Sequence, residues 1–443
     1  MDPREHYGAR FETFAAELAA SDPAWLAARR KDAMSAFSAQ GFPTTRMEEW
    51  RYTSVAPLAR TAFELAPGAP PGLRREHVEA ASLPVYACSL YVFVNGRFAP
   101  ALSARPAPAN EVAVRSLASE LAERPDRLEP LLARRAPVEG AAFVALNTAF
   151  LRDGAFLEIA PGARLAAPVH VVHLAYPDGR ETVSHPRALV VAGRDSEATV
   201  IEDHVSLGEG TFFTNAVTEI ELEAGARLDY VKLQREAPGG YHVSAVQATL
   251  GRDARFLSVT LSLGGALTRS DLEARLDGPG ADCTLDGLYV AGDRQLVDNH
   301  TTIDHLRPHG TSRELYKGIL DGRSRGVFRG RVIVRKEAQK TDSRQTNKNL
   351  LLSRDAEADS KPQLEISADD VKCSHGSTIG QLEEDALFYL RARGIDEVEA
   401  RRLLLRAFAS EVTQAIREEP VRSEVEALLL ARLRLEPSAE APQ

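Results

Sequence analysis

The stretch LEIAPGARLAAPVHVVHL at residues 157–174 opens the part of the chain that decides its fold. Short runs of Val, Ile, Leu and Thr alternate there with turn residues. The same texture returns in VVAGRDSEATVIEDHVSL (190–207), IELEAGARLDYVKL (220–233) and ATLGRDARFLSVTLSL (248–263). A period of about 30 residues with several short strands per unit predicts a stacked all-β solenoid, because one unit cannot bury its own apolar face. The punctuating glycines, at steps of 31, 32, 26 and 29 residues, are Gly162, Gly193, Gly225, Gly251 and Gly280.

The imperfect period leaves a large β-sandwich open as the competing interpretation. No run repeats every six residues, which argues against the narrower class of β-helix built from hexapeptides. Both interpretations make the chain mainly β.

Helical patterns flank this β core. Ser21-Asp22-Pro23 is typical of a helix start, and Asn95-Gly96 after an apolar run indicates a tight hairpin turn. Near the C-terminus, Asp396 followed by Glu399 resembles a capping box. The next predicted helix carries the apolar stripe Leu404, Phe408, Val412 and Ile416. We therefore expect a mostly helical N-terminal domain at 1–140, the β core at 141–380 and a C-terminal helical domain at 381–443.

Composition narrows the class of protein. Lys and Arg number 54 against 63 Asp and Glu, a net charge of −9, and 44% of the 443 residues are hydrophobic. These values are ordinary for a soluble globular protein and argue against bulk disorder and against a strongly basic nucleic-acid binder. The most apolar stretch, residues 83–94, is too short to span a bilayer, and residues 1–30 are charged and lack the apolar region of a signal peptide. Three cysteines without a CxxC pair fit a reducing compartment, so we expect a cytoplasmic protein that binds neither nucleic acid nor membrane.

Phosphate-binding signatures are absent from the sequence. It contains no GxxxxGK[ST] and no GxGxxG between a strand and a helix. We therefore expect that the chain itself neither hydrolyses ATP nor binds NAD through a standard loop.

Two charged stretches each suggest a function, nucleic-acid binding for the first and glycoside chemistry for the second. Each stretch also has a structural explanation. Residues 313–348 hold eleven Lys or Arg against four Asp or Glu, a net of +7. In residues 327–335, however, arginines alternate with Phe328, Val332 and Val334, as a half-buried strand requires. Glu365 with Asp369 and Asp370 suggests paired carboxylates for glycoside chemistry, but adjacent strand residues point to opposite faces.

Histidines form the next candidates for metal ligands. His300, His305 and His309 lie within ten residues, although Pro308 and their spacing exclude a common helix face. His170 and His173 are more readily explained as hydrogen-bonded structural histidines.

Cys373-Ser374-His375 is the sharpest constellation in the chain. Positions i and i+2 of a strand point to one side, so the thiol and the imidazole could approach one metal ion. Both ligand types suit iron, zinc and copper. Two ligands are too few for a tight four-ligand site, so other groups or another chain would have to complete it. An inert cysteine beside a surface histidine, or a Cys–His nucleophile pair, is the alternative.

Several ordered strings resemble the SufB/SufD family of the SUF iron–sulfur cluster assembly system. The chain carries His375-Gly376-Ser377-Thr378 where the SufB branch has His-Glu-Ala-Thr, which places it on the SufD side of the family. The middle of the chain, residues 140–295, matches in texture only. The strings are PTTRMEEWRYT (43–53), DNHTTIDH (298–305), ELYKGIL (314–320), KNLLLS (348–353), KPQLEISADDVKCSHGSTIGQL (361–382) and LFYLRARGI (387–395).

The resemblance implies a fold, partners and a site. It implies a right-handed parallel β-helix between helical domains, in agreement with the period. It further implies a non-catalytic scaffold subunit that pairs through the β-helix end with a SufB-like paralogue and docks a SufC-like ABC ATPase on its C-terminal helices, at about 381–436. A transient Fe–S cluster would form at the paralogue interface, with His375 and, more weakly, Cys373 as candidate ligands.

Some points stay open at this stage. The chain has Pro308-His309-Gly310 where family members often show Pro-His-Cys, so no cluster role can rest on that position. A primary scaffold of the SufB type and a β-helix carbohydrate enzyme remain alternatives. The sequence also leaves open a flavin on the complex, a homodimer of the isolated chain, and whether Trp50 and Tyr52 are interface anchors or core.

Overall fold

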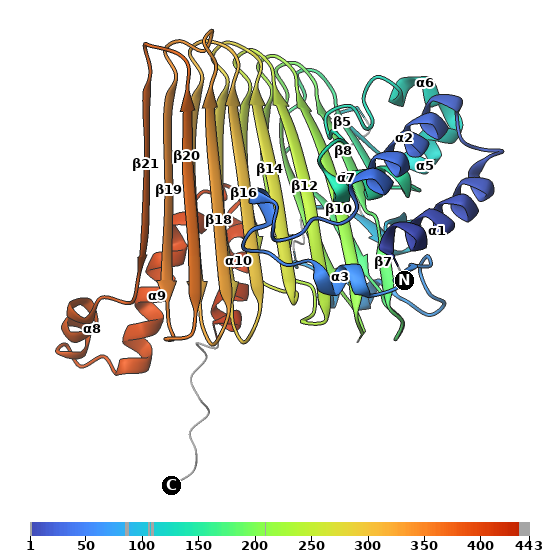
Figure 1. Ribbon diagram of the computed structural model, residues 1–443. Coiled ribbons are helices and arrows are strands. Elements are labelled where there is room, and N and C mark those ends of the chain that lie inside the picture. The colour runs from blue at the N-terminus through green and yellow to red at the C-terminus, as the bar shows by residue number, and fades with distance from the viewer. Residues whose placement is uncertain (1, 85–87, 105–106, 108–109, 209, 434–443) are drawn as a thin grey trace.

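The centre of the molecule is a parallel β-solenoid of about eight turns (Figure 1). The computed structural model describes residues 2–84, 88–104, 107, 110–208 and 210–433. Successive strands of the solenoid alternate between two sheets, so from residue 187 onward each strand pairs with the one two places further along the chain. The predicted solenoid is confirmed. The β-sandwich alternative is wrong, because a sandwich is built from antiparallel ladders, whereas these ladders are parallel except for two, which pair 89–94 with 97–98 and 112–116 with 155–159.

The two sheets contain eleven and ten strands among the described residues. The eleven-stranded sheet consists of β1 (Glu64–Leu65), β4 (Val112–Ser116), β5 (Ala155–Ile159), β7 (Thr182–Ser184), β8 (Arg187–Ala192), β10 (Phe212–Leu222), β12 (Gly240–Leu250), β14 (Leu267–Leu276), β16 (Leu296–His305), β18 (Arg325–Val334) and β20 (Glu357–Ile366). The ten-stranded sheet consists of β2 (Ser89–Val94), β3 (Arg97–Phe98), β6 (Val169–Ala175), β9 (Glu197–Ser206), β11 (Arg227–Gln234), β13 (Arg255–Ser262), β15 (Asp282–Ala291), β17 (Thr311–Leu320), β19 (Asp342–Leu351) and β21 (Lys372–Gly380).

One corner of the solenoid explains the period seen in the sequence. At this corner a residue of each turn adopts a positive φ, for example Gly225 at 71° and Asp253 at 55°. Glycine has no Cβ to clash there, and Asp tolerates this region better than most residues. The backbone N–H of Gly225 donates to the carbonyl of Arg252 one turn on, at 2.8 Å, so the corners stack as the strands do. Gly162, Asp195, Gly280, His309 and Lys340 occupy the same corner, which makes His309 a turn residue.

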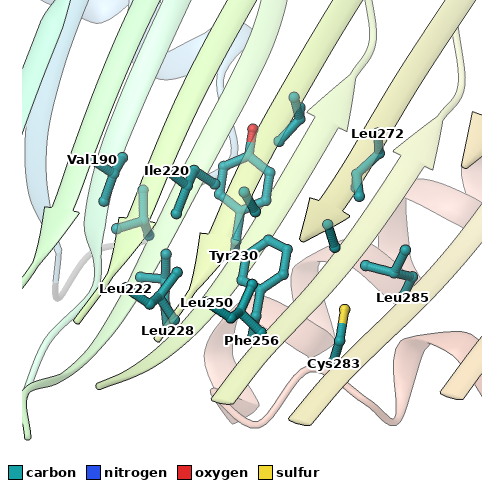
Figure 2. Packing of buried hydrophobic residues seen from close by; sticks show 14 of the residues in the cluster. Val190, Ile220, Leu222, Leu228, Tyr230, Leu250, Phe256, Leu272, Cys283 and Leu285 are labelled. Carbon is teal, nitrogen blue, oxygen red and sulfur yellow. The ribbon is translucent and has the colours of Figure 1, made fainter. Parts of the chain in front are cut away.

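The interior between the sheets, which we call the lumen, is packed rather than hollow. Apolar side chains from successive turns lie in rows along the solenoid axis, and Figure 2 shows Leu228, Tyr230 and Phe256 among them. Each is at most 1% exposed. Burying a side chain of this size contributes about 1.5–3 kcal/mol, so the rows supply much of the stability of the stack.

Most of the N-terminal helices cover the outer face of the eleven-stranded sheet at the start of the solenoid (Figure 1), whereas those at 75–81 and 100–102 pack on the ten-stranded sheet. The predicted turn at Asn95-Gly96 is confirmed between β2 and β3, with φ values of 51° and 78°. β2 and β4 pair with the solenoid sheets, so these sheets extend back into the first 140 residues. The helices are α1 (Pro3–Leu18), α2 (Ala24–Gln40), η1 (Glu48–Trp50), α3 (Ala56–Arg60), α4 (Arg75–Ala81), η2 (Pro100–Leu102), α5 (Leu117–Glu123), α6 (Pro125–Leu128) and α7 (Ala142–Ala149).

Three C-terminal helices follow β21: α8 (Glu384–Arg391), α9 (Glu397–Thr413) and α10 (Glu419–Arg432). The predicted cap is confirmed, since the Asp396 carboxylate accepts from the backbone N–H of Glu399 at 3.0 Å. α9 packs on the outer face of the ten-stranded sheet. Its buried stripe includes Leu405, Ala409 and Val412, and Ile416 continues it just beyond the helix end, so the predicted stripe is wrong by one residue in its first half. Among the described helices, none is long and apolar enough to cross a membrane.

Candidate functional site

β21 ends the solenoid at the side opposite the N-terminal helices (Figure 1). In the described part of the chain it pairs with β19 alone, and β20 pairs with β18 alone. The side chains of β19 are buried at alternate positions, whereas those of β21 are exposed at all but one position, Cys373. The last turn of the solenoid therefore has no covering layer among the described residues.

The side chains of Cys373 and His375 point into the lumen of this last turn. In the parallel register they lie beside Ser343 and Gln345, which are both buried in the lumen. Residues side by side in register share a face of the sheet. Two residues beyond His375, the Ser377 hydroxyl donates across the lumen to the Ser360 hydroxyl of β20, at 2.8 Å. The predicted juxtaposition of thiol and imidazole therefore lies at the open mouth of the solenoid.

The backbone of β21 offers hydrogen-bonding groups at its outer edge. The N–H of Lys372 donates to the carbonyl of Thr341 at 2.8 Å. Because successive residues of a strand direct these groups to alternate sides, the even-numbered residues from Lys372 to Gly380 bond to β19. The N–H and C=O groups of Cys373, His375 and Ser377 therefore face the outer edge. An exposed strand edge is a template for pairing with another chain.

Cys373 is the less accessible of the two candidate ligands. It packs against the apolar rows of the lumen, and burial raises the pKa of its thiol above the ordinary value. Among the described residues, no third His, Cys, Asp or Glu lies close enough to form a three-ligand group with Cys373 and His375. The structure thus brings the two predicted ligands together on one strand and adds none to them.

A row of polar side chains leads from the lumen to His375. Glu314 of β17, Gln345 of β19 and His375 of β21 lie side by side in register. The Gln345 amide donates to the Glu314 carboxylate at 2.6 Å. Burial raises the pKa of Glu314 to about 7. The imidazole of His375 therefore ends a row that has polar groups at its last three positions.

Apolar side chains are exposed at the same mouth. Ile366 of β20 and Ile379 of β21 are 44% and 48% exposed. Both continue lumen rows, since Ile366 lies beside Val334, which is buried, and Ile379 lies beside Asn349. A further turn stacked on this end would bury both residues.

A second apolar surface lies on the C-terminal helices, with α8 projecting beyond β21 in Figure 1. Phe388 and Tyr389 of α8 are 73% and 56% exposed, and Val398 of α9 is 61% exposed. We call these three residues, with Leu403, the helical patch. Beside it is a cleft of about 510 Å³ lined by residues that include Leu352, Leu382, Phe388, Arg391 and Arg401.

Glu365 and Asp370, which the sequence suggests as a carboxylate pair for glycoside chemistry, each form an ion pair with a different basic residue. Glu365 accepts two hydrogen bonds from Arg331, at 2.7 and 2.8 Å. Asp370 pairs with Lys340. Neither carboxylate faces the other across a cleft, so the pattern in the sequence reflects charge pairing between neighbouring turns.

The three clustered histidines do not form a site in the described structure. His300 lies 3.0 Å from an oxygen of Asp298, whereas His305 lies in the lumen against the hydroxyl of Ser312, at 3.0 Å. His309 is a corner residue.

The letters of residues 322–326, GRSRG, also fit the GxSxG pattern of a nucleophile elbow. Ser324 is nevertheless buried at a solenoid corner and donates its hydroxyl to the carbonyl of Ala291, at 3.2 Å.

The basic stretch 313–348 is a set of solenoid strands, as the structural explanation held. Phe328, Val332 and Val334 are buried in the lumen. On the outer face, Arg325 pairs with Asp359 at 2.7 Å and Arg331 pairs with Glu365 of the next turn. The excess charge is therefore partly neutralised by acidic residues from neighbouring turns.

Trp50 is a core residue that joins the N-terminal segment to the solenoid. It is 8% exposed, its ring lies 5.3 Å from that of Phe143, and the Arg269 guanidinium lies over it at 4.0 Å. Arg269 also pairs with Asp298 at 2.7 Å, and Thr53 donates to the same carboxylate oxygen at 2.5 Å. Burial alone would raise the pKa of Asp298, but Arg269 and His300 hold it below its usual range. Tyr52 is half-buried, with Arg325 over its ring at 5.5 Å.

One group of potential ligands was missed by reasoning along the sequence. His173, Glu202 and His204 meet inside the solenoid. The signal that could have found them is the spacing of 31 residues between the two histidines, which is one solenoid turn.

Comparison with known proteins identifies the family. A model described as "SUF system FeS cluster assembly, SufBD core domain" matches residues 175–408, and one described as "SufBD protein N-terminal region" matches residues 1–171. The iron-sulfur cluster assembly protein SufD of Escherichia coli is 34% identical over 396 residues, which cover 89% of this chain and 90% of that protein.

Two further relatives agree. The SufBD family protein slr0076 of Synechocystis sp. is 32% identical over 412 residues, which cover 90% of each chain. Protein ABCI7, chloroplastic, of Arabidopsis thaliana is 33% identical over 292 residues, which cover 64% of this chain and 62% of that one. The chain therefore belongs to the SufBD family of SUF-system iron–sulfur cluster assembly proteins.

Proposed function

We propose that this chain is a non-catalytic scaffold subunit whose open solenoid end pairs with a SufB-like paralogue. The observation that carries the proposal is the last turn, where β20 and β21 have no neighbour on their outer sides within the described chain. Ile366 and Ile379 are exposed there beside unpaired backbone groups. Terminal turns of a solenoid need a cap, and a second solenoid stacked end to end would supply one.

The nascent Fe–S cluster is the substrate of this interface. His375 and Cys373 offer one imidazole and one thiol from the same face of β21, and cluster irons take four ligands each, mostly thiolates and sulfides. The paralogue would therefore provide the remaining ligands. Because burial raises the pKa of the Cys373 thiol, His375 is the stronger candidate of the two.

The helical patch is the proposed dock for a SufC-like ABC ATPase. Exposed aromatic residues are enriched at the centres of protein interfaces, and Phe388 and Tyr389 are the most exposed large aromatic side chains on the C-terminal helices. The ATPase would supply the nucleotide chemistry for which this sequence has no phosphate-binding signature. We also propose that the domain boundaries lie at residues 140 and 380. We further propose that the protein is located in the cytoplasm.

The alternatives receive less support from the geometry. A primary scaffold would need its own set of ligands, yet Cys88 and Cys283 are buried at 4% and 0% exposure, far along the chain from β21. Burial raises the pKa of the Cys283 thiol well above its ordinary value. A carbohydrate enzyme would need opposed carboxylates, and Glu365 and Asp370 are engaged in ion pairs.

The test is cluster maturation by the complex that copurifies with this chain. We expect His375→Ala to leave the complex assembled while lowering the yield of cluster at least roughly tenfold, as the loss of a metal-binding group does. Ser374→Ala is the matched control, because residue 374 lies on the opposite face of the same strand. Unchanged maturation in the His375→Ala complex would remove His375 from the site, and failure to recover a β-helix paralogue would contradict the scaffold proposal itself.

A further inference from the structure

A cluster of potential metal ligands lies inside the early turns of the solenoid, on other strands than the candidate site. His173 belongs to β6, and Glu202 and His204 belong to β9. His173 and His204 are direct register partners, and their rings stack with centroids 4.9 Å apart. Glu202 precedes His204 by two residues and so shares its face. The repeat of the solenoid thus places three ligand-type side chains together in the lumen.

The three side chains are close and almost completely buried. One ligand atom from each lies within 4.8 Å of the other two. His204 Nε2 is 2.9 Å and His173 Nε2 is 3.6 Å from the same carboxylate oxygen, Oε1 of Glu202. None of the three residues is more than 3% exposed. Small side-chain rotations would bring these atoms to the distances that bonds to one central ion require.

Three of the four ring nitrogens of His173 and His204 lack the partners that buried imidazoles normally have. Neither ring nitrogen of His173 has a hydrogen-bond partner within the described structure, and Nδ1 of His204 has none either. Buried polar groups are nearly always hydrogen-bonded, and each exception calls for an explanation. Nε2 of His173 is directed toward Glu202, so a ligand between the three side chains would satisfy it.

Glu202 is held in an orientation suited to this role. Its second oxygen, Oε2, accepts from the hydroxyls of Thr218 and Tyr230, at 2.9 and 2.7 Å, and the Thr218 hydroxyl also lies 3.1 Å from Oε1. These donors fix the carboxylate and leave Oε1 facing the two imidazoles, as outer partners of metal ligands do.

We propose that His173, Glu202 and His204 bind a divalent first-row transition ion, Fe²⁺ or Zn²⁺, as a resident ion of the lumen. Two imidazoles and one carboxylate form a donor set that proteins use for both ions. The ion would link β6 to β9 and so fasten two neighbouring turns near the start of the stack. This site is separate from Cys373 and His375, and it does not depend on the proposed cluster role of β21.

The experiment uses the full chain produced in minimal medium supplemented with Fe²⁺, Zn²⁺ or Co²⁺ alone. After EDTA treatment and desalting, we expect about one ion per chain by elemental analysis, because a site closed during folding retains its ion. His173→Gln and His204→Gln should each lower the ion content at least tenfold. His305→Gln is the matched control, since His305 is a lumen histidine that has a hydrogen-bond contact with Ser312.

Two further measurements keep the outcome decisive. The Co²⁺ form of the unaltered chain should show visible absorption bands of nitrogen and oxygen ligation, without a thiolate-to-cobalt band, even where the variants fail to fold. The double variant Cys373→Ser with His375→Ala should keep its ion. Unaltered chain that contains less than a tenth of an ion in all three media overturns the inference, as does an ion content that the histidine variants do not change.

Discussion

Folding raises the pKa of the Glu314 carboxyl, which lies in the lumen, into a pH range where its effect on stability can be measured. Burial raises its pKa to about 7, and one carboxylate oxygen has no hydrogen-bond partner in the described structure. Burial, followed by the charge of Glu314, also raises the pKa of Asp286 to about 7. The folded state therefore favours protonated carboxyls here. Their contribution to stability is complete below the unfolded-state pKa of about 4.3 and is lost as the pH rises through about 7.

This linkage predicts that Glu314→Gln stabilises the protein at alkaline pH. Glutamine keeps an oxygen that can accept from Gln345, and it never ionises. We expect the variant to exceed the unaltered chain by about 1–3 kcal/mol in free energy of unfolding at pH 8, and by much less at pH 5. Urea unfolding at both pH values measures this. A larger gain at pH 5 than at pH 8 would contradict the assigned pKa shift.

Which residues of the candidate sites can be recognised from the sequence depends on how far apart they lie along the chain. Cys373 and His375 could be placed on one face of a strand from the sequence, because they are two residues apart; their role as ligands stays a prediction. His173 and His204 were missed because they meet only through the register of two turns, which requires the full length of each turn to be known. Trp50 could not be assigned for the same reason, since its partner Arg269 lies 219 residues away.

At the scale of elements, β21 makes a sharp prediction about pairing. The N–H of Ser377 faces the outer edge, so a proline there removes no hydrogen bond of the β19–β21 ladder, and proline is tolerated on edge strands. We expect Ser377→Pro to fold but to lower recovery of the paralogue in copurification at least tenfold, because the paralogue strand would lose a donor and meet the ring.

The control for this variant is Ser377→Ala, which removes the hydrogen bond to Ser360 and keeps the backbone N–H. It should retain the paralogue. Thr378→Pro, by contrast, removes an N–H that bonds to β19 and should lower the unfolding midpoint. Full recovery of the paralogue with Ser377→Pro would show that the outer edge of β21 does not pair.

The helical patch yields a separate prediction. Phe388→Asp places a charge on the most exposed aromatic side chain of α8, and α8 has no buried residue to disrupt. Loss of an aromatic anchor costs about 2 kcal/mol in binding, so we expect the affinity for the ATPase to fall roughly 30-fold, measured by titration calorimetry. Met47→Asp, at a 43% exposed residue of the N-terminal segment, is the matched control. Equal affinities for both variants would exclude the patch as the dock.

Element prediction from the sequence succeeded where the signal was local. The Asn95-Gly96 hairpin and the Asp396 cap depend on neighbouring residues and are confirmed. The stripe of α9 was misplaced by one residue because Leu405 faces the ten-stranded sheet, whereas Phe408 lies under the Lys317 ammonium, 4.2 Å from its ring centre. That choice is made by the surface on which the helix packs, which the helix sequence alone does not contain.

At the scale of the whole molecule, one end of the stack is covered and the other is open. The N-terminal helices cover the first turns, while Ile366 and Ile379 remain exposed at the last turn. If this end pairs with a paralogue, as we propose, it should also pair weakly with a second copy of the chain. We expect the isolated chain to form dimers as its concentration rises, in sedimentation velocity experiments, and Ser377→Pro to abolish them. A chain that stays monomeric at all concentrations would show that the end discriminates against itself.

The regular stacking of turns has a consequence for distance. Strands of one sheet are spaced by ~4.8 Å, so the six steps from β9 to β21 separate the buried histidine cluster from His375 by roughly 29 Å along the solenoid axis. That separation can change only by whole turns, because a partial turn would rotate every lumen side chain out of its row. The length of the solenoid therefore changes in steps of one turn, each built from about 30 residues. In a relative whose core is longer by one turn, the open end would lie one strand spacing further along the axis, and each row of lumen side chains would stay in register.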